Sequence, residues 1–282
     1  MSTPLPVVFA RLVDDAAVYP PGNAPLHEAV KDHRRHRSAW YGGLVGPLLV
    51  PASATGQLTD LVDPAEGFAV GLVADTGIAG LRAALAAPPP ALVQAEIAVA
   101  KRGEDPLPGV AALLDLVRQL DGLKAYAEVP LTFGLLSALD TLAGARREGL
   151  PVAAKFRTGG LAAELFPTPI ELAAVICACR DRELPFKLTA GLHHAIRHTD
   201  PETGFIHHGF LNVLVGTAQA VRGTEVADVA ATLAITDPVP LIEATRRLLN
   251  DDRPLWIGFG SCSVLDPVED LARLGLLPGT KA

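Results

Sequence analysis

The sequence predicts a single (β/α)8 barrel, the fold also called a TIM barrel. Eight short apolar segments recur along the 282 residues, and a segment with apolar residues at helical spacing follows each of them. Strands that are joined by crossover helices run parallel, and eight such units in one chain of this length favour a closed barrel over an open doubly wound sheet. With 49% hydrophobic residues, the chain can bury one large core. We therefore expect residues 1–282 to form one domain.

The predicted strands are brief hydrophobic runs, and the clearest helix lies between the sixth and the seventh of them. Thr168 is the predicted N-cap of that helix, Pro169 fits its first position, and Glu171 completes a capping box. The eight strands are predicted at residues 12–18, 44–50, 68–74, 92–99, 125–131, 151–157, 185–189 and 255–263.

The connection between the seventh and eighth strands is an extended insertion. More than 60 residues separate these two strands, whereas roughly 20 to 30 residues separate the others. An insertion at the carboxyl end of a barrel strand lies on the face where barrel active sites form. We expect residues 192–250 to form this connection. We expect residues 192–208 to cover that face as a mobile lid or to form a subunit contact.

Composition and charge indicate which kinds of partner to expect. The net charge of -7 provides no basic surface for nucleic acid. No apolar run reaches the length of a membrane span, and the first residues do not resemble a signal peptide. The three cysteines fit packing positions better than a disulfide framework. We expect a cytoplasmic protein that binds a small molecule and neither nucleic acid nor a membrane, with a homo-oligomer left open.

Two lysines stand inside the predicted sixth and seventh strands. Only six of the 24 basic residues are lysine, so arginine carries most of the ordinary positive charge. A lysine that is kept inside an apolar strand indicates chemistry that arginine cannot perform, because lysine can lose its proton and act as a nucleophile or base. Lys155 and Lys187 are therefore the predicted catalytic pair. A buried ion pair or a phosphate contact is the structural alternative for both.

The predicted chemistry is the attack of Lys155 on a carbonyl compound. Only a neutral amine condenses with a carbonyl, and an ordinary lysine with a pKa near 10.4 is almost always charged at pH 7. A second ammonium about 5 Å away would lower the pKa of Lys155 by roughly two units, and Lys187 is expected to supply it. Glu96 is the first candidate to move protons and Glu128 the second. Either one could instead be a structural partner of a barrel cation.

The substrate-binding residues are expected near the carboxyl ends of the strands. Arg157 lies on the same strand face as Lys155 and suits a carboxylate or phosphate, although it could instead neutralise Glu128. The other residues expected to contact the substrate here are Asp14, Thr158, Thr189, His193 and His194.

The strand order and the lysine motifs resemble the deoxyribose-phosphate aldolase family of class I aldolases. Lys155-Phe-Arg-Thr158-Gly159 is similar to the family's sixth-strand signature, whose lysine forms a Schiff base. Phe186-Lys187-Leu-Thr-Ala-Gly191 is similar to the segment that carries its second lysine, and Ala95-Glu96-Ile97 falls where the family has an acidic residue. The resemblance implies a Schiff-base lysine at Lys155.

The resemblance extends to the first and last strands. The last segment is similar to the family's phosphate-binding backbone, which implies substrate contacts at Gly258, Gly260, Ser261 and Ser263. Val13-Asp14-Asp15 is similar to the family's opening strand, but Asp15 stands where the family usually has histidine. Gly191 is followed by Leu192 rather than by a second glycine.

We expect a Schiff-base, aldolase-like lyase that needs no cofactor and no metal and acts on a small anionic aldehyde or ketone. Two alternatives stay open. In the first, His193, His194, His207 and His208 bind a divalent metal with Asp14 or Glu96, and the barrel is a metal-dependent hydrolase or isomerase. In the second, the barrel has no catalytic activity and binds an anionic metabolite at residues 258–263 and the following helix.

Overall fold

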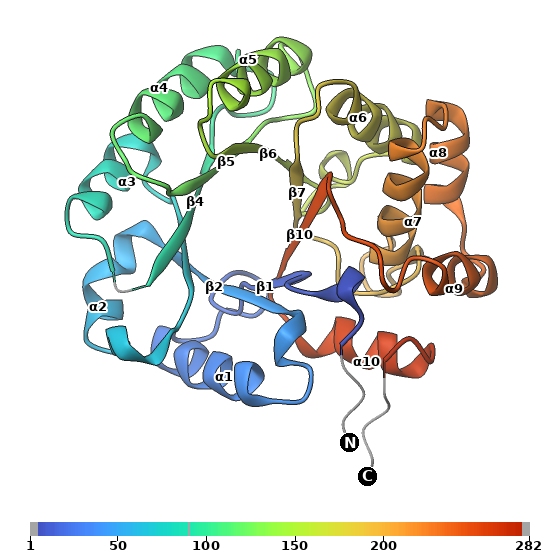
Figure 1. The fold of residues 1–282 in the computed structure, drawn as a ribbon, viewed down its shortest axis with the longest axis horizontal. Helices are drawn as coiled ribbons and strands as arrows, with labels where there is room; N and C mark the ends of the chain where they lie inside the picture. Colours follow the sequence, from blue (N-terminus) through green and yellow to red (C-terminus); the bar gives the residue numbers. More distant parts are fainter. Residues whose placement is uncertain (1–4, 90, 278–282) are drawn as a thin grey trace.

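The computed structural model describes residues 5–89 and 91–277, and it forms a closed barrel (Figure 1). Eight parallel strands surround the axis in the order β1-β10-β7-β6-β5-β4-β3-β2, which confirms the predicted (β/α)8 barrel. The barrel strands are β1 (Val13–Asp15), β2 (Val45–Pro51), β3 (Val70–Val73), β4 (Leu92–Ala98), β5 (Lys124–Glu128), β6 (Val152–Arg157), β7 (Phe186–Thr189) and β10 (Trp256–Ser261).

The helices form the outer layer of the barrel (Figure 1). Within the described ranges, none of them is both long enough and apolar enough to cross a membrane. They are α1 (Leu26–Ser38), α2 (Thr55–Thr59), α3 (Gly77–Ala86), α4 (Leu107–Val117), α5 (Leu135–Arg147), α6 (Pro169–Asp181), α7 (Phe210–Val221), α8 (Val226–Ala234), α9 (Pro238–Arg246) and α10 (Leu265–Arg273). Single-turn 3-10 helices lie in the connections at η1 (Val7–Phe9), η2 (Gly42–Leu44), η3 (Ala52–Ala54), η4 (Pro64–Glu66) and η5 (Ala163–Leu165).

Local sequence signals account for where several elements begin and end. The predicted capping box opens α6, because the Thr168 hydroxyl accepts from the Glu171 amide and the Glu171 carboxylate accepts from the Thr168 amide. β1 is shorter than predicted, since the Asp15 carboxylate accepts a hydrogen bond from the amide of Ala17 and turns the chain. β5 ends before the predicted boundary because Pro130 has no amide to donate to a neighbouring strand.

The strand register places charged residues in one layer of the barrel. Lys155 on β6 lies opposite Lys187 on β7, and Glu128 on β5 lies opposite Lys155. Residues opposite each other in a sheet project from the same face. The three side chains therefore enter the barrel together, although they are far apart in the sequence.

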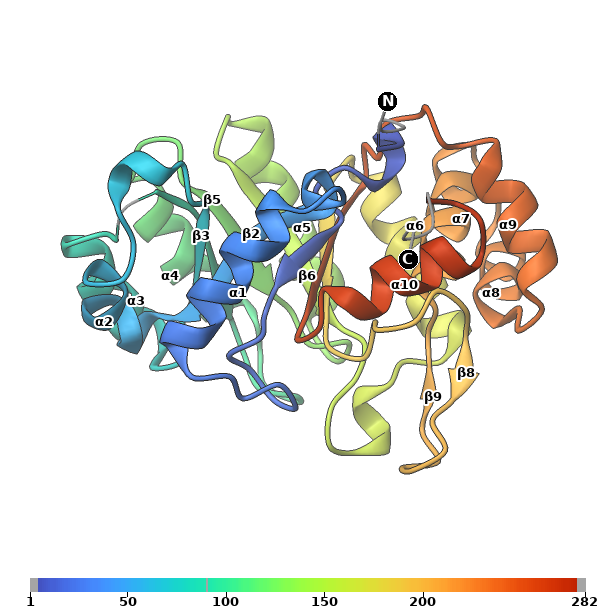
Figure 2. The ribbon, with the colours of Figure 1, turned by 90° about the horizontal axis from the view of Figure 1, so that it is seen from below.

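The insertion between β7 and β10 contains a hairpin and three helices. The hairpin consists of β8 (His198–Thr199) and β9 (Ile206–His207), and α7, α8 and α9 follow it. Figure 2 shows the hairpin projecting beyond the barrel, beside the loop that follows β6. The ring of Phe166 in that loop lies 5.0 Å from the ring of Phe205 and 4.8 Å from the ring of His207. The loop after β6 therefore packs against the hairpin, whose mobility stays a prediction.

A buried histidine fastens the hairpin to this loop. His208 Nε2 donates to the carbonyl of Pro167 over 2.7 Å, and its Nδ1 accepts from Arg197 Nη1 over 3.3 Å. A ring that accepts at one nitrogen and donates at the other is neutral. Burial, reinforced by the charge of Arg197, lowers the pKa of His208 to about 4. The contact therefore depends on the neutral ring.

We expect acidification to weaken this contact. The pKa of His208 is about 4 in the folded protein and near 6.5 in the unfolded chain, so the stabilisation is present above pH 6.5 and is lost as the pH falls toward 4. Between pH 7 and pH 5 the free energy of unfolding should fall by about 2 kcal/mol from this group. Urea unfolding of the wild type and of His208→Gln at both pH values measures the difference, because glutamine keeps a donor but binds no proton. An equal pH dependence in both proteins would contradict this account.

Candidate active site inside the barrel

Five ionisable side chains meet inside the barrel and form the central cluster. They come from five strands, and all but the Glu128 side chain are buried. The cluster consists of Asp14 on β1, Glu96 on β4, Glu128 on β5, Lys155 on β6 and Lys187 on β7. Three carboxylates and two ammonium groups therefore share the largely buried interior of the barrel.

Glu96 joins the two lysines. Its Oε2 lies 2.8 Å from Lys155 Nζ, and its Oε1 accepts a hydrogen bond from Lys187 Nζ. Lys155 Nζ also lies 2.8 Å from Glu128 Oε2, and Lys187 Nζ also donates to Asp14 Oδ2. Each ammonium therefore contacts two carboxylates.

Two neutral side chains, those of Gln94 and Tyr126, complete the surroundings of Lys187 in the central cluster. Gln94 Nε2 lies 2.8 Å from Asp14 Oδ2 and 3.0 Å from Glu96 Oε1, so one amide group contacts both carboxylates. Lys187 Nζ lies 5.2 Å from the centre of the Tyr126 ring, within the range of a cation–π contact. Lys187 is thus surrounded by groups that favour its charged form.

The carboxylates hold both lysines protonated. Burial opposes the charge of Lys155, but Glu128 and Glu96 outweigh it and raise the pKa of the ammonium. Burial is likewise outweighed at Lys187, where Asp14 and Glu96 raise the pKa. The charge of Lys187 does act to lower the pKa of Lys155, as the sequence predicts, but this effect is too weak to decide the direction. The predicted lowered pKa of Lys155 is therefore wrong for the free protein.

The three carboxylates differ in how well their charge is compensated. Burial favours the neutral acid in each. Lys155 and Lys187 outweigh it at Glu96 and lower that pKa to about 2, and Lys155 and Arg157 lower the pKa of Glu128. At Asp14, burial prevails over Lys187, and Glu96 adds repulsion, so the pKa is raised. Asp14 is thus the carboxylate of the cluster that takes a proton most readily.

Arg157 lies where the central cluster approaches solvent. Its Nε donates to Glu128 Oε1 over 3.0 Å. The exposed fraction of the side chain falls from 44% at Arg157 to 15% at Glu128, 5% at Lys155 and 0% at Glu96. A molecule that reaches Lys155 from the carboxyl ends of the strands therefore meets Arg157 and Glu128 first.

From the sequence we expect Lys187 to point into the barrel near its carboxyl-terminal mouth, together with Lys155, Glu96 and Arg157, but Lys187 faces a different space. It lines a cavity of about 430 Å³ together with Asp14, Gln94 and Tyr126. The same cavity is lined by Leu92 and Lys124, the first residues of β4 and β5, so it lies at the amino-terminal end of the barrel. Barrel enzymes carry their active sites at the opposite end. Lys155 is therefore the lysine on the side where chemistry is expected.

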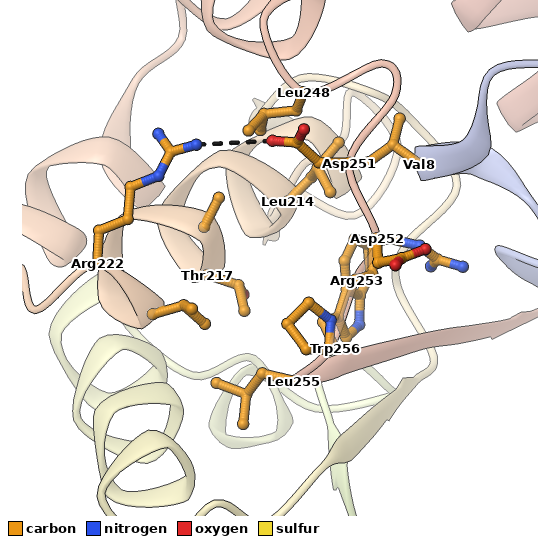
Figure 3. Close-up of a pocket in the computed structure, with 13 residues that line it drawn as sticks. Val8, Leu214, Thr217, Arg222, Leu248, Asp251, Asp252, Arg253, Leu255 and Trp256 are labelled. Carbon is orange, nitrogen blue, oxygen red and sulfur yellow. Dashed lines mark ion pairs between the residues drawn. The ribbon is translucent and has the colours of Figure 1, made fainter.

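A second cavity, of about 200 Å³, lies outside the barrel. Leu214 and Thr217 on α7 line it together with Trp256 at the start of β10. Figure 3 shows Arg222 paired with Asp251 beside it, over 3.7 Å. It contains no member of the central cluster, so it is not part of the candidate active site.

Thr158 and Thr189, both predicted to bind substrate, lie at the carboxyl ends of β6 and β7. The Thr158 hydroxyl donates to the carbonyl of Ala190 over 2.6 Å and so fastens the end of β6 to the end of β7. Thr189, the last residue of β7, lies opposite Arg157 and Gly260 in the register. The glycines after these strands allow a close approach, since a Cβ atom on Gly159 would lie 2.8 Å from the Cα of Gly191.

The predicted phosphate-binding segment is divided between the two ends of the barrel. Gly258 lines the amino-terminal cavity, and a Cβ atom on it would lie 2.4 Å from the carbonyl oxygen of Leu12, so backbone packing accounts for this glycine. A Cβ atom on Gly260 would lie 3.2 Å from a methyl group of Leu49. At the carboxyl end, Ser261 Oγ accepts from the amide of Ser263, and Ser263 Oγ accepts from the amide of Asp266. These side chains shape the start of α10.

The four histidines proposed as metal ligands have four different partners. His193 Nδ1 lies 3.1 Å from Asp266 Oδ2, and His194 Nδ1 lies 3.3 Å from Asp270 Oδ2. His207 bonds the carbonyl of Gly191, and His208 that of Pro167. In the described part of the chain, no group of three or more His, Cys, Asp and Glu side chains is arranged to hold a metal ion. The metal-dependent alternative therefore has no ligand set there.

Cys262 and Asp266, which lie where β10 meets α10, are not singled out from the sequence. Cys177 and Cys179 are buried as predicted, but Cys262 is not fully buried, and its Sγ lies 3.6 Å from His193 Nε2. Asp266 lies on the other side of the same imidazole. The sequence feature that could have pointed to Cys262 is its position between a predicted barrel strand and the first turn of the helix that follows.

We expect the central cluster to be intolerant of losing one charge. Lys187→Met should lower the free energy of unfolding by about 3–5 kcal/mol, because Asp14 would lose its lysine partner and Glu96 would lose one of its two. Adding Asp14→Asn should restore part of the loss. Arg182→Met, which breaks the surface pair with Asp140, is the control and should cost less than about 1 kcal/mol. Urea unfolding measures all four proteins, and wild-type stability in Lys187→Met would contradict the ion-pair account.

Comparison with models of known protein families and with curated proteins finds no match to this sequence. The assignment of a function therefore depends on the geometry of the site.

Proposed function

We propose that the protein is a Schiff-base lyase of the class I aldolase type, in which Lys155 attacks the carbonyl carbon of a small anionic aldehyde or ketone. The observation that carries the proposal is the position of Lys155 Nζ, 2.8 Å from both Glu96 and Glu128 on the carboxyl side of the barrel. A lysine nucleophile needs a base within hydrogen-bond reach, and this lysine has two. The resemblance of its strand to the sixth-strand motif of the deoxyribose-phosphate aldolases supports the same role.

The raised pKa of Lys155 requires that substrate binding trigger the loss of its proton. Arg157 now pairs with Glu128, and an anionic substrate would compete for the same guanidinium. Once Arg157 turns to the substrate, Glu128 loses a cationic partner and its pKa rises. Glu128 can then accept a proton from Lys155 and leave a neutral amine. The substrate would thereby activate the nucleophile that attacks it.

The later steps follow from the positions of the two glutamates. Attack gives a carbinolamine, and protonated Glu128 returns its proton to the departing hydroxyl as water leaves and the iminium forms. The iminium keeps the positive charge beside Glu96, which stabilises it as it stabilised the ammonium. Glu128, again a carboxylate, takes the proton of the substrate β-hydroxyl while the carbon–carbon bond breaks. An enamine and an aldehyde result, and protonation and hydrolysis of the enamine release Lys155.

In this scheme Glu128 carries the protons. From the sequence, Glu96 is the first candidate for that role and Glu128 is the second. Glu96 has no exposed surface and contacts both lysines, whereas Glu128 is partly exposed and lies next to Arg157. Lys187 acts as a positioning residue, because its ammonium holds Glu96 in place from the amino-terminal side. The proposal includes a cytoplasmic location and a small-molecule substrate, with neither nucleic acid nor a membrane as partner.

A barrel without catalytic activity is the second candidate. It is favoured by one observation, the raised pKa of both lysines, which is also what a purely structural ion-pair network would show. The two candidates differ in whether Lys155 ever loses its proton, and chemical trapping distinguishes them.

Borohydride reduction in the presence of small carbonyl compounds should fix an adduct on Lys155, as read by intact mass and peptide mapping. Lys155→Arg keeps the cation between Glu96 and Glu128 and should abolish trapping. Arg157→Gln removes both the guanidinium that holds the anion and the cationic partner of Glu128. Trapping by glycolaldehyde phosphate should therefore fall at least tenfold relative to trapping by uncharged glycolaldehyde, which should not fall and should rise if loss of Arg157 frees Glu128 to take the proton of Lys155. A chelator should have no effect. Equal labelling of Lys155→Arg and the wild type would contradict the Schiff-base proposal, and turnover that a chelator abolishes would favour the metal-dependent alternative.

A further inference from the structure

A thiol, an imidazole and a carboxylate lie in series where β10 meets α10. Cys262 directly follows the last residue of β10, and its Sγ lies 3.6 Å from His193 Nε2. The other ring nitrogen, Nδ1, lies 3.1 Å from Asp266 Oδ2. One nitrogen of His193 thus faces a nucleophile, and the other faces a group that orients the ring.

The three residues come from separate parts of the chain that the fold holds together. His193 belongs to the connection after β7, whereas Asp266 lies in the first turn of α10. The amide of Asp266 donates to Ser263 Oγ over 3.2 Å, which fixes the start of the helix. His193 is partly exposed, and so is Cys262, whereas Cys177 and Cys179 are buried. Among the cysteines, a small reagent therefore reaches Cys262 most readily.

The surroundings of His193 favour a positive charge beside Cys262 Sγ. Burial opposes a charged ring, but hydrogen bonds to Asp266 and Cys262 outweigh it and raise the pKa of His193 to about 9. The imidazolium can then donate from both nitrogens, to the carboxylate and to the sulfur. Two further histidines act on this series of residues. His207 on β9 lies close enough to His193 for their charges to repel, and the charge of His194 attracts that of Asp266. An adjacent imidazolium is the environment that turns a thiol into a reactive thiolate.

We propose that Cys262 is a nucleophile that His193 activates and Asp266 positions, and that it accepts acyl groups from small activated esters or thioesters. The sulfur attacks the carbonyl carbon, the bond to the alcohol or thiol breaks, and the leaving group takes the proton from His193 Nε2. A thioester then joins the acyl group to Cys262. Neutral His193 takes a proton from water, which hydrolyses the thioester and restores the thiolate and the imidazolium. No step requires Lys155, so this activity does not rest on the proposed lyase.

The pH dependence of alkylation tests the activation of Cys262. An ordinary thiol with a pKa near 8.5 is only about 1% thiolate at pH 6.5. Iodoacetamide should therefore alkylate Cys262 of the wild type at pH 6.5 much faster than it alkylates an ordinary thiol, because His193 Nε2 lies 3.6 Å from the sulfur. In His193→Gln the rate at pH 6.5 should fall roughly 50-fold or more and should recover at pH 9. His194→Gln is the matched control, since this neighbouring histidine pairs with Asp270 and should leave the profile unchanged.

Acyl transfer tests the proposed activity itself. 4-Nitrophenyl acetate should give a burst of one nitrophenolate per chain and an acetyl group on the peptide that contains Cys262. Cys262→Ser should lose the burst, Asp266→Asn should slow it, and Lys155→Arg should keep it, which separates this centre from the lyase site. Peptide mapping assigns the acetyl group. Acetylation of lysines alone, or an alkylation profile that is the same in His193→Gln and the wild type, would overturn the proposal.

Discussion

The arrangement of the barrel interior depends on one carboxylate, that of Glu96, which has no exposed surface and lies between two ammonium groups. A buried carboxylate is costly unless it is paired, and its pKa of about 2 shows that the two lysines more than offset the cost of burial. Each lysine in turn needs a second carboxylate, which Glu128 and Asp14 supply. The five charged side chains of the central cluster, one from each of five strands, therefore depend on one another for charge compensation.

This dependence divides the central cluster into two sides with different properties. Lys187 and Asp14 line the amino-terminal cavity, where a glutamine and a tyrosine ring complete their surroundings. Lys155 and Glu128 lie toward the carboxyl ends of the strands, where Arg157 is in contact with solvent. A ligand that draws Arg157 away acts directly on the second side, through Glu128. The cluster can thus stabilise the fold on one side and respond to a ligand on the other.

Periodicity in the sequence predicts the barrel and the matched positions of Lys155 and Lys187, because both depend on short-range patterns within strands and helices. The direction of the pKa shift at Lys155 could not be predicted in this way. It depends on the register of β4, β5 and β6, which brings Glu96 and Glu128 to the same nitrogen. Cys262 and His193 are 69 residues apart, so their contact depends on how the insertion folds. Close backbone packing accounts for Gly258, where the resemblance to the aldolase family implies phosphate binding.

The central claim is that Lys155 alone gives up its proton, and only when a carbonyl ligand binds. ¹⁵N NMR of lysine-labelled protein tests it directly, since the chain contains only six lysines and Lys155→Arg and Lys187→Arg assign the two signals. Without ligand, both Nζ signals should be those of ammonium groups throughout the neutral pH range. With a small anionic aldehyde, the Lys155 signal should move to the position of an iminium while the Lys187 signal stays. Ammonium signals at both lysines under conditions of turnover would contradict the account.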